Sequence, residues 1–358
     1  MKTISFVLPC LSRYPSGGFK VIYEYANAFA ARGYNVNLLF DITRSLARFN
    51  FPKLIKNSGC YVLNKIYPQW FHLNKNIVKM CIDGINEKSI PDGDIIVATA
   101  IQTAFPVSKL SNFKGKKIYF IQGFEAWGGC SEQEVYSSYQ LGMVNVVVSN
   151  FLKQRMIKNT GIIPEYIPNF VDMDVFNLDI MPKQRDPYTI AMLCAEGPSK
   201  GTKYGLEVLH RLKMIYPALS VNLFGTVKKF SGVESWMKYT FSATAKELRY
   251  IYNNSSIYLY PSLLEGWGLT GMESMACGCA YVASDYGGVH EYAEQNKHVL
   301  LSAPKDVDGL LNHTITLIES SKKRCEMAMS GYNHIKHNFS KEKSFSKFEA
   351  LCDSIAFK

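Results

Sequence analysis

A glycine-rich stretch flanked by two glutamates carries the strongest chemical signal in this sequence. Residues 257–260 form a short apolar run that predicts a strand, and good helix formers fill residues 269–276. Free N–H groups at the start of such a helix bind phosphate, and the helix dipole favours negative charge there. Glu265 precedes the helix start and Glu273 stands eight residues later. Because carboxylates accept hydrogen bonds from hydroxyls, the pattern indicates a phosphate site with a sugar at one end and a ribose at the other.

The same glycines allow a second interpretation. Gly266, Gly268 and Gly271 spell G-x-G-x-x-G, and Asp285 follows Gly266 by 19 residues, which matches the spacing of a dinucleotide-binding fingerprint. Residues 261–265 separate the expected strand end from the first glycine, however, and bulky Trp267 stands between the first two glycines. An NAD-dependent oxidoreductase that uses these glycines stays as an alternative.

Short apolar runs alternate with helical patterns along both halves of the chain. This alternation predicts an α/β architecture of two facing, doubly wound, Rossmann-like domains, with ligand sites at the carboxyl ends of the strands. We expect the domains at residues 1–168 and 169–340, and a C-terminal helix at 341–358 that packs back toward the N-terminal domain. The expected strands are residues 4–8, 36–40, 95–98, 118–121 and 144–148, and then 188–193, 220–224, 257–260, 281–283 and 299–301.

Several motifs, in their order along the chain, resemble those of the retaining glycosyltransferases of family 4. The spacing from Glu265 to Glu273 and the run EGWGLTGMESMACGCAYVAS are similar to the family signature. The further matches are Ser16-Gly17-Gly18, then Ile167-Pro168-Asn169-Phe170-Val171-Asp172 with Phe170 where the family has glycine, then Pro198-Ser199-Lys200-Gly201, and then Gly287-Gly288 with Glu291. The resemblance extends from Gly17 to Glu291.

This resemblance implies the GT-B fold, with the active site in the cleft between two Rossmann-like domains. It implies transfer of a sugar from a nucleotide-diphosphate donor to an acceptor hydroxyl, with retention at the anomeric carbon. Glu265 and Lys200 would be the catalytic residues. The donor would be bound by Gly17 and Gly18 from the N-terminal domain, by Lys200 and the N–H groups of Gly268, Leu269 and Thr270 at the diphosphate, by Glu265 at the sugar, and by Glu273 at the ribose.

The sequence departs from the family pattern at two positions. The family has an arginine five residues before its lysine, where this chain has Ala195, so that either Lys200 acts alone or Lys203 substitutes. On the acceptor side the family often has a histidine, and here Gln122 or Glu125 takes that position. Each motif also has an ordinary structural interpretation: Glu273 as a solvated helix residue, and the other residues as parts of turns or surface loops.

Metal-binding patterns are not evident in the sequence. The nine cysteines include no C-x-x-C pair and are typical of reduced thiols in a cytosolic protein, and the seven histidines show no ligand spacing. Asp92-Gly93-Asp94 resembles a metal-binding D-x-D, but a turn before the strand at residues 95–98 explains it better. We expect neither a metal nor another cofactor, only the nucleotide sugar as substrate.

The net charge of +10 lies entirely in the first 160 of the 358 residues, which hold 19 lysines and arginines against nine acidic residues. Two basic segments with aromatic or apolar side chains stand out, residues 44–56 and 67–79. They predict docking on an anionic membrane surface, and a helix packed on the core is the alternative. No nucleic-acid-binding motif is present, and no apolar stretch approaches the length of a membrane span.

The leading hypothesis is a hexosyltransferase that acts on a glycan or lipid-linked acceptor in bacterial capsule or lipopolysaccharide synthesis. We expect a cytoplasmic protein, peripheral on the inner membrane. Besides the oxidoreductase, the alternatives are a GT-B-fold sugar-nucleotide epimerase, a phosphorylase, and a non-catalytic scaffold that has lost the family arginine.

Overall fold

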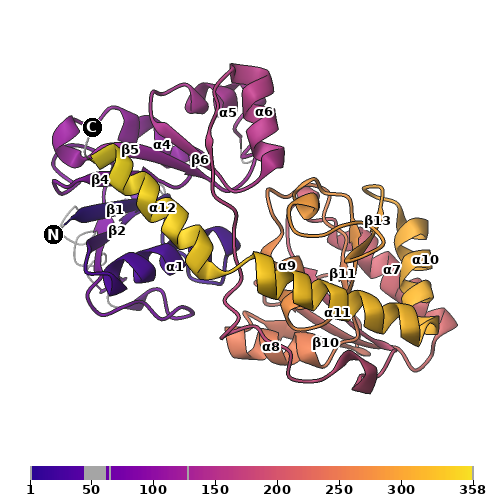
Figure 1. Cartoon of the computed structure of the whole chain (residues 1–358). Coiled ribbons are helices and arrows are strands. Elements are labelled where there is room, and N and C mark those ends of the chain that lie inside the picture. The colour runs from indigo at the N-terminus through magenta and orange to yellow at the C-terminus, as the bar shows by residue number, and fades with distance from the viewer. Residues whose placement is uncertain (1, 44–61, 64–65, 127–128, 357–358) are drawn as a thin grey trace. The chain divides into compact units, whose positions relative to one another are not determined.

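The chain forms two compact units in a computed structural model that describes residues 2–43, 62–63, 66–126 and 129–356. The N-terminal unit consists of Met1–Pro168 with Phe345–Lys358, and the C-terminal unit is Asn169–Ser344 (Figure 1). Each unit is built on its own parallel sheet. The basic segment at residues 44–56 lies outside the described residues.

The N-terminal unit contains a seven-stranded parallel sheet in the order β3-β2-β1-β4-β5-β6-β7. Its central strands are buried runs of β-branched and aromatic residues, as strands covered by helices on both faces require. Its elements are β1 (Thr3–Leu8), α1 (Gly17–Ala31), β2 (Asn35–Asp41), β3 (Val78–Ile82), β4 (Ile95–Ala98), α4 (Ile101–Ser108), η1 (Asn112–Lys114), β5 (Lys116–Ile121), α5 (Glu132–Tyr139), β6 (Val144–Val147), α6 (Asn150–Thr160) and β7 (Glu165–Tyr166).

The C-terminal unit repeats this architecture with a six-stranded parallel sheet in the order β10-β9-β8-β11-β12-β13. Two doubly wound, Rossmann-like domains are thus confirmed. The elements are η2 (Pro182–Gln184), β8 (Thr189–Cys194), η3 (Pro198–Lys200), α7 (Thr202–Ile215), β9 (Ser220–Gly225), β10 (Met237–Phe241), α8 (Ala245–Asn253), β11 (Ile257–Tyr260), α9 (Leu269–Ala276), β12 (Ala280–Ser284), η4 (Gly288–Glu291), β13 (Val299–Ser302), α10 (Val307–Glu319) and α11 (Ser321–Asn338).

The strand order determines where each sheet can bind a ligand. In the C-terminal unit β8 and β11 are hydrogen-bonded neighbours, and the order of the strands reverses between them. In the N-terminal unit the same reversal lies between β1 and β4. Open parallel sheets bind ligands beyond the carboxyl ends of the strands at such a point. We therefore expect the loops that follow β8 and β11 to bind a ligand.

The sequence did not predict β3, β7 and β10, and all three lie at sheet edges. An edge strand has a neighbouring strand on one side only, so its residues are more exposed and need not form a continuous apolar run. In β3, for example, only the last residue is buried. The alternative prediction for the basic segment at residues 67–79, a helix packed on the core, is wrong. Residues 67–77 are not helical and β3 begins at Val78.

The last helix, α12 (Lys341–Ala356), returns the chain to the N-terminal unit (Figure 1). Phe345 and Phe348 are buried on it and pack against Tyr25 and Phe29 of α1, with ring centroids 4.9–6.4 Å apart. Aromatic packing of this kind joins the C-terminal end of the chain to the first helix.

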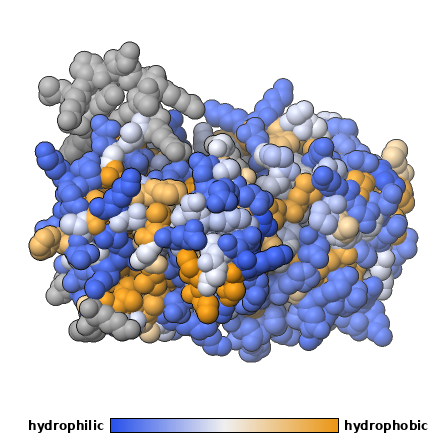
Figure 2. Space-filling view, turned by 90° about the horizontal axis from the view of Figure 1, so that it is seen from above, coloured by the Kyte–Doolittle hydropathy of each residue, from blue (hydrophilic) through white to orange (hydrophobic). Residues whose placement is uncertain are grey.

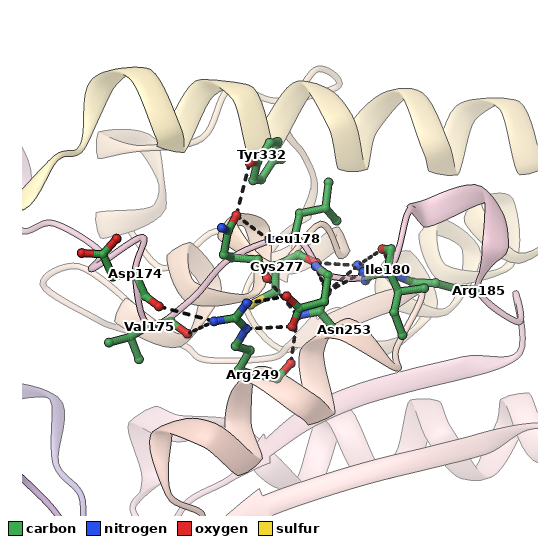
Figure 3. A network of polar contacts seen from close by, with 11 residues as sticks. Asp174, Val175, Leu178, Ile180, Arg185, Arg249, Asn253, Cys277 and Tyr332 are labelled. Carbon is green, nitrogen blue, oxygen red and sulfur yellow. Dashed lines mark hydrogen bonds and ion pairs between the residues drawn. The ribbon is translucent and has the colours of Figure 1, made fainter.

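Residues 172–186, which lead from the N-terminal unit to β8, are bound to the rest of the C-terminal unit by a buried arginine (Figure 3). Arg185 is 6% exposed. Its guanidinium donates to the carbonyl oxygens of Ile180, Tyr252, Ser255 and Cys277 at 2.5–3.0 Å. The carbonyls of Tyr252, Ser255 and Cys277 lie at the C-terminal ends of α8 and α9, where a cation interacts favourably with the helix dipoles.

Replacing Arg185 with methionine should lower the free energy of unfolding by about 3 kcal/mol, because buried carbonyls would lose their donors. Chemical denaturation measures this change. The matched control is Arg211→Met, which removes an exposed ion pair to Asp308 and should cost less than about 1 kcal/mol. Equal losses for the two variants would contradict the role given to Arg185.

Candidate functional site

Two loops at the carboxyl edge of the C-terminal sheet are joined by hydrogen bonds. The turn after β8 contains Ser199, whose carbonyl accepts the Leu263 N–H at 2.7 Å and the Ser262 hydroxyl at 3.1 Å. Gly201 follows in the left-handed region with φ +62°, and a Cβ there would collide with the carbonyl oxygen of Pro261. Glycine is therefore required for the turn to approach the end of β11 so closely.

This contact brings together Lys200 and Glu265, the two residues whose roles as catalytic and donor-binding groups remain predictions. The Lys200 Nζ lies 2.7 Å from Glu265 Oε1. The same oxygen accepts hydrogen bonds from the Ser262 hydroxyl at 2.9 Å and the Tyr260 hydroxyl at 3.0 Å. The single hydrogen of the Ser262 hydroxyl is shared between this oxygen and the Ser199 carbonyl. Together with the Lys200 ammonium and the Tyr260 hydroxyl it holds the carboxylate in one orientation, and the ammonium has two further N–H groups for a ligand.

Both charged side chains remain partly accessible, Lys200 at 33% and Glu265 at 16%. Tyr260 beneath them is buried, and burial together with the nearby Glu265 raises the pKa of its phenol well above the usual value. Tyr260 therefore acts as a hydrogen-bond donor rather than an acid. A purely structural ion pair would not need to reach solvent. Because Lys200 and Glu265 are partly exposed at the point where the strand order reverses, both charges can still bind a substrate.

The loop from Gly266 to Gly268 leads into the start of α9. Gly268 has φ +90°, and a Cβ on it would lie 2.5 Å from the Tyr286 hydroxyl. No side chain caps this helix, and its first turn has no acidic residue. The N–H groups of Leu269 and Thr270 have no earlier carbonyl within the helix to bind, so the helix start is suited to an anion.

Glu273, the second predicted carboxylate, lies inside the unit rather than on its surface. It is 5% exposed on α9, and the Tyr252 hydroxyl donates to its Oε2 at 3.4 Å. The interpretation as a solvated helix residue is therefore wrong. Its assignment to a ribose stays a prediction.

The N-terminal unit brings together Gly18 and Gln122. Gly17 is the first residue of α1, whose N-cap Ser16 makes no side-chain capping bond, and the Gln122 amide donates to the Gly18 carbonyl at 3.0 Å. Glu125 instead accepts the Ile101 N–H at 2.5 Å, at the start of α4. Gln122 thus contacts the glycine turn and Glu125 caps another helix, and their acceptor roles remain predictions.

At the position of the family arginine, the backbone of Ala195 exchanges hydrogen bonds with the Thr202 hydroxyl. Lys203, the suggested substitute, is exposed, with its ammonium 4.8 Å from the centre of the Tyr204 ring. Asp92 pairs with Lys114, and the Asp94 carboxylate accepts the Thr3 N–H just before β4. Within the described ranges, no three histidine, cysteine or acidic side chains gather as metal ligands would.

Sequence reasoning missed the polar residues that hold this site. Ser262 is fully buried behind Glu265, and its position three residues earlier in the chain was the available signal. Three further tyrosines, at 281, 286 and 292, join their hydroxyls beside Gly268. Their spacing carries no recognisable motif, since the contact depends on how β12 and the loop after it fold.

Comparison with known proteins finds a family match within the C-terminal unit. Residues 179–334 match the family model of glycosyl transferases group 1. The O-antigen chain mannosyltransferase B of Escherichia coli is 30% identical over 91 residues, which are 25% of this chain and 23% of that protein. The chain thus aligns with less than a quarter of that relative's length.

Solved structures share the fold over nearly the whole chain. Sucrose-phosphate synthase from Thermosynechococcus elongatus superposes with a TM-score of 0.77 at 12% identity, covering 99% of each chain. HepE of Anabaena in complex with UDP-glucose gives 0.74 at 14% identity, covering 99% of this chain and 100% of HepE. The predicted GT-B fold class is confirmed.

Glu125 should make the stability of the protein depend on pH. Burial raises the pKa of its carboxyl from 4.5 to about 7, although the Ile101 N–H opposes the shift. The folded state therefore holds this proton more tightly than the unfolded state, and stability falls as the pH rises from about 4.5 to 7. Glu125→Gln should remove that loss, about 3 kcal/mol, so its melting temperature relative to wild type should rise between pH 5 and pH 8. Glu165→Gln, on the exposed β7, is the control and should show no such change; a flat difference for Glu125→Gln would contradict the assignment.

Proposed function

We propose that the protein is a retaining glycosyltransferase of family 4. It transfers a hexose from a nucleotide-diphosphate sugar to a hydroxyl of a glycan or lipid-linked acceptor in the synthesis of a surface polysaccharide. The observation that carries the proposal is the Lys200–Glu265 pair at the switch point of the C-terminal sheet, in the same loop as the uncapped start of α9. The match to glycosyl transferases group 1 covers these residues and supports it.

The chemistry follows from the groups present. The bond between the anomeric carbon and the donor's phosphate oxygen breaks, and the leaving diphosphate gains negative charge. Lys200 and the N–H groups at the start of α9 stabilise that charge. The acceptor oxygen bonds to the anomeric carbon on the same face and passes its proton to the departing phosphate. Glu265, oriented by Ser262 and Tyr260, accepts hydrogen bonds from hydroxyls of the donor sugar.

The relatives suggest which donors to try first. The aligned E. coli protein is a mannosyltransferase of the O-antigen chain, and HepE was crystallised with UDP-glucose. A mannosyl donor is our first candidate and a glucosyl donor our second, with a lipid-linked glycan as the acceptor.

Glu265→Ala should lower kcat for sugar transfer by about 100- to 1000-fold, because the donor sugar loses the group that orients it. The assay offers GDP-mannose, UDP-glucose and other nucleotide sugars to the wild type, and the active donor to each variant. Glu207→Ala, at an exposed position of α7, is the matched control and should be fully active. Full activity of Glu265→Ala, with the fold retained, would overturn the role of Glu265.

Two further readouts separate this function from others. The anomeric configuration of the product, measured by NMR, should equal that of the donor, and inversion would exclude a retaining reaction. Sugar isomerisation without any acceptor would indicate an epimerase, and thermal stabilisation by NADH instead of nucleoside diphosphates would indicate an oxidoreductase.

We further propose that the N-terminal unit binds the cytoplasmic face of an anionic membrane. The attraction between its positive charges and the lipid headgroups would be the only binding force. This unit holds 21 lysines and arginines against 12 acidic residues. Trp70 and Phe71 of the basic segment at 67–79 pack on Tyr23, with ring centroids 5.5 and 5.3 Å apart. Hydrophilic residues cover most of the face drawn in Figure 2, with apolar residues in smaller patches. Among the described helices, none has both the length and the apolar character that crossing a bilayer requires.

In a flotation assay, the protein should bind vesicles that contain phosphatidylglycerol and not vesicles of phosphatidylcholine alone. Binding should disappear as NaCl rises from about 50 to 500 mM, because salt screens attraction between exposed charges. Binding that resists salt, or equal binding to both kinds of vesicle, would exclude purely electrostatic docking.

A further inference from the structure

Three buried tyrosines join their hydroxyl groups directly behind the start of α9. Tyr281 belongs to β12, Tyr286 to the loop after it, and Tyr292 follows η4; each is at most 1% exposed. The Tyr281 hydroxyl lies 2.8 Å from that of Tyr286 and 3.2 Å from that of Tyr292, and the hydroxyls of Tyr286 and Tyr292 are also hydrogen-bonded. The Tyr292 hydroxyl donates to the carbonyl oxygen of Gly268 at 3.0 Å.

The acceptor at the end of this chain determines the direction of its hydrogen bonds. Burial raises the pKa of all three phenols, so each keeps its one hydrogen at neutral pH. A carbonyl oxygen can only accept, so the hydrogen of Tyr292 points to Gly268. Tyr281 and Tyr286 must then donate within the cluster, which polarises the Tyr292 hydroxyl and strengthens its bond to Gly268.

The Gly268 carbonyl and the Leu269 N–H belong to one peptide group. In a planar trans peptide the C=O and N–H bonds point in opposite directions. A hydrogen bond that holds the carbonyl toward the buried tyrosines therefore turns the Leu269 N–H away from them. Polarisation of the carbonyl also raises the partial positive charge on that N–H.

The glycine spacing in this loop is explained by the same cluster. A Cβ on Gly268 would lie 2.9 Å from Cζ of Tyr286, and one on Gly271 would lie 2.7 Å from Cζ of Tyr281. The backbone carbonyl of Tyr286 also accepts the Glu265 N–H at 3.3 Å, and the Trp267 ring stacks on Tyr292 with centroids 5.7 Å apart. Both glycines thus make room for phenols, and the tyrosines contact the loop from Glu265 to Gly271 along its length.

We propose that Tyr292, backed by Tyr281 and Tyr286, is a positioning residue that aims the Leu269 N–H at the diphosphate of the donor. This inference rests on the proposed function. It assigns the orientation of the Leu269 N–H, a backbone donor, to the side chain of Tyr292. The phenols do not touch the donor; they act through the Gly268 peptide.

The test compares Tyr292→Phe with Tyr281→Phe by calorimetric titration with UDP, GDP and the parent nucleosides. Both variants lose one hydroxyl from the same buried cluster and keep the ring, but only the Tyr292 hydroxyl donates to the Gly268 carbonyl. Tyr292→Phe should weaken diphosphate binding about threefold to tenfold and leave nucleoside binding unchanged. Tyr281→Phe removes a polarising donor and not the bond to Gly268, so it should weaken diphosphate binding less than Tyr292→Phe, with Tyr286→Phe between the two and nucleoside binding unchanged in both.

A second readout needs no ligand. Hydrogen exchange of the peptide that contains Leu269 should be faster in Tyr292→Phe than in Tyr281→Phe, because the Gly268 carbonyl then keeps only the N–H groups of Gly271 and Met272 as donors. Equal exchange in the two variants, or equal weakening of diphosphate and nucleoside, would overturn the inference. If the wild type binds no nucleoside diphosphate at all, the proposed function fails, and the exchange rates alone decide whether Tyr292 orients this peptide.

Discussion

The contact between the turn after β8 and the end of β11 determines where the charged groups of the C-terminal unit stand. Ser199 offers one carbonyl to both Leu263 and Ser262, and Gly201 lets the two backbones come within hydrogen-bonding distance. Lys200 and Glu265, 65 residues apart in the sequence, meet only because of it. The parallel pairing of β8 with β11 supplies the frame, since neighbouring strands end at the same edge of a sheet.

The helix next to this contact is held at both ends by buried polar groups. Isolated helices as short as α9 are not stable in water, so its position depends on its surroundings. At its start Tyr292 binds the Gly268 carbonyl, and at its end Arg185 binds the Cys277 carbonyl. A helix anchored in this way keeps the direction of its first N–H groups, which is what recognition of a diphosphate requires.

The sequence predicted the parts of this structure that depend on local pattern. Buried central strands such as β4 and β11 are continuous apolar runs, and the helix start at Leu269 follows from the glycines before it. Edge strands such as β3 and β10 lack that pattern because one side is open. The partners of Glu265 depended on folding: Ser262 and Tyr260 look like ordinary strand-end residues until the loop turns them toward one oxygen. The tyrosine cluster could not be predicted either, because its three hydroxyls meet only once β12 and the loop after it have folded.

The proposed function requires nucleoside diphosphate binding at the start of α9, and a crystal structure of the protein with UDP or GDP tests this most directly. We expect the diphosphate oxygens within hydrogen-bonding distance, about 2.7–3.2 Å, of the Leu269 N–H and of the Lys200 ammonium, with Glu265 facing the end where the sugar would attach. A nucleotide bound elsewhere on the chain, or one whose phosphates avoid both Lys200 and the start of α9, would contradict the account.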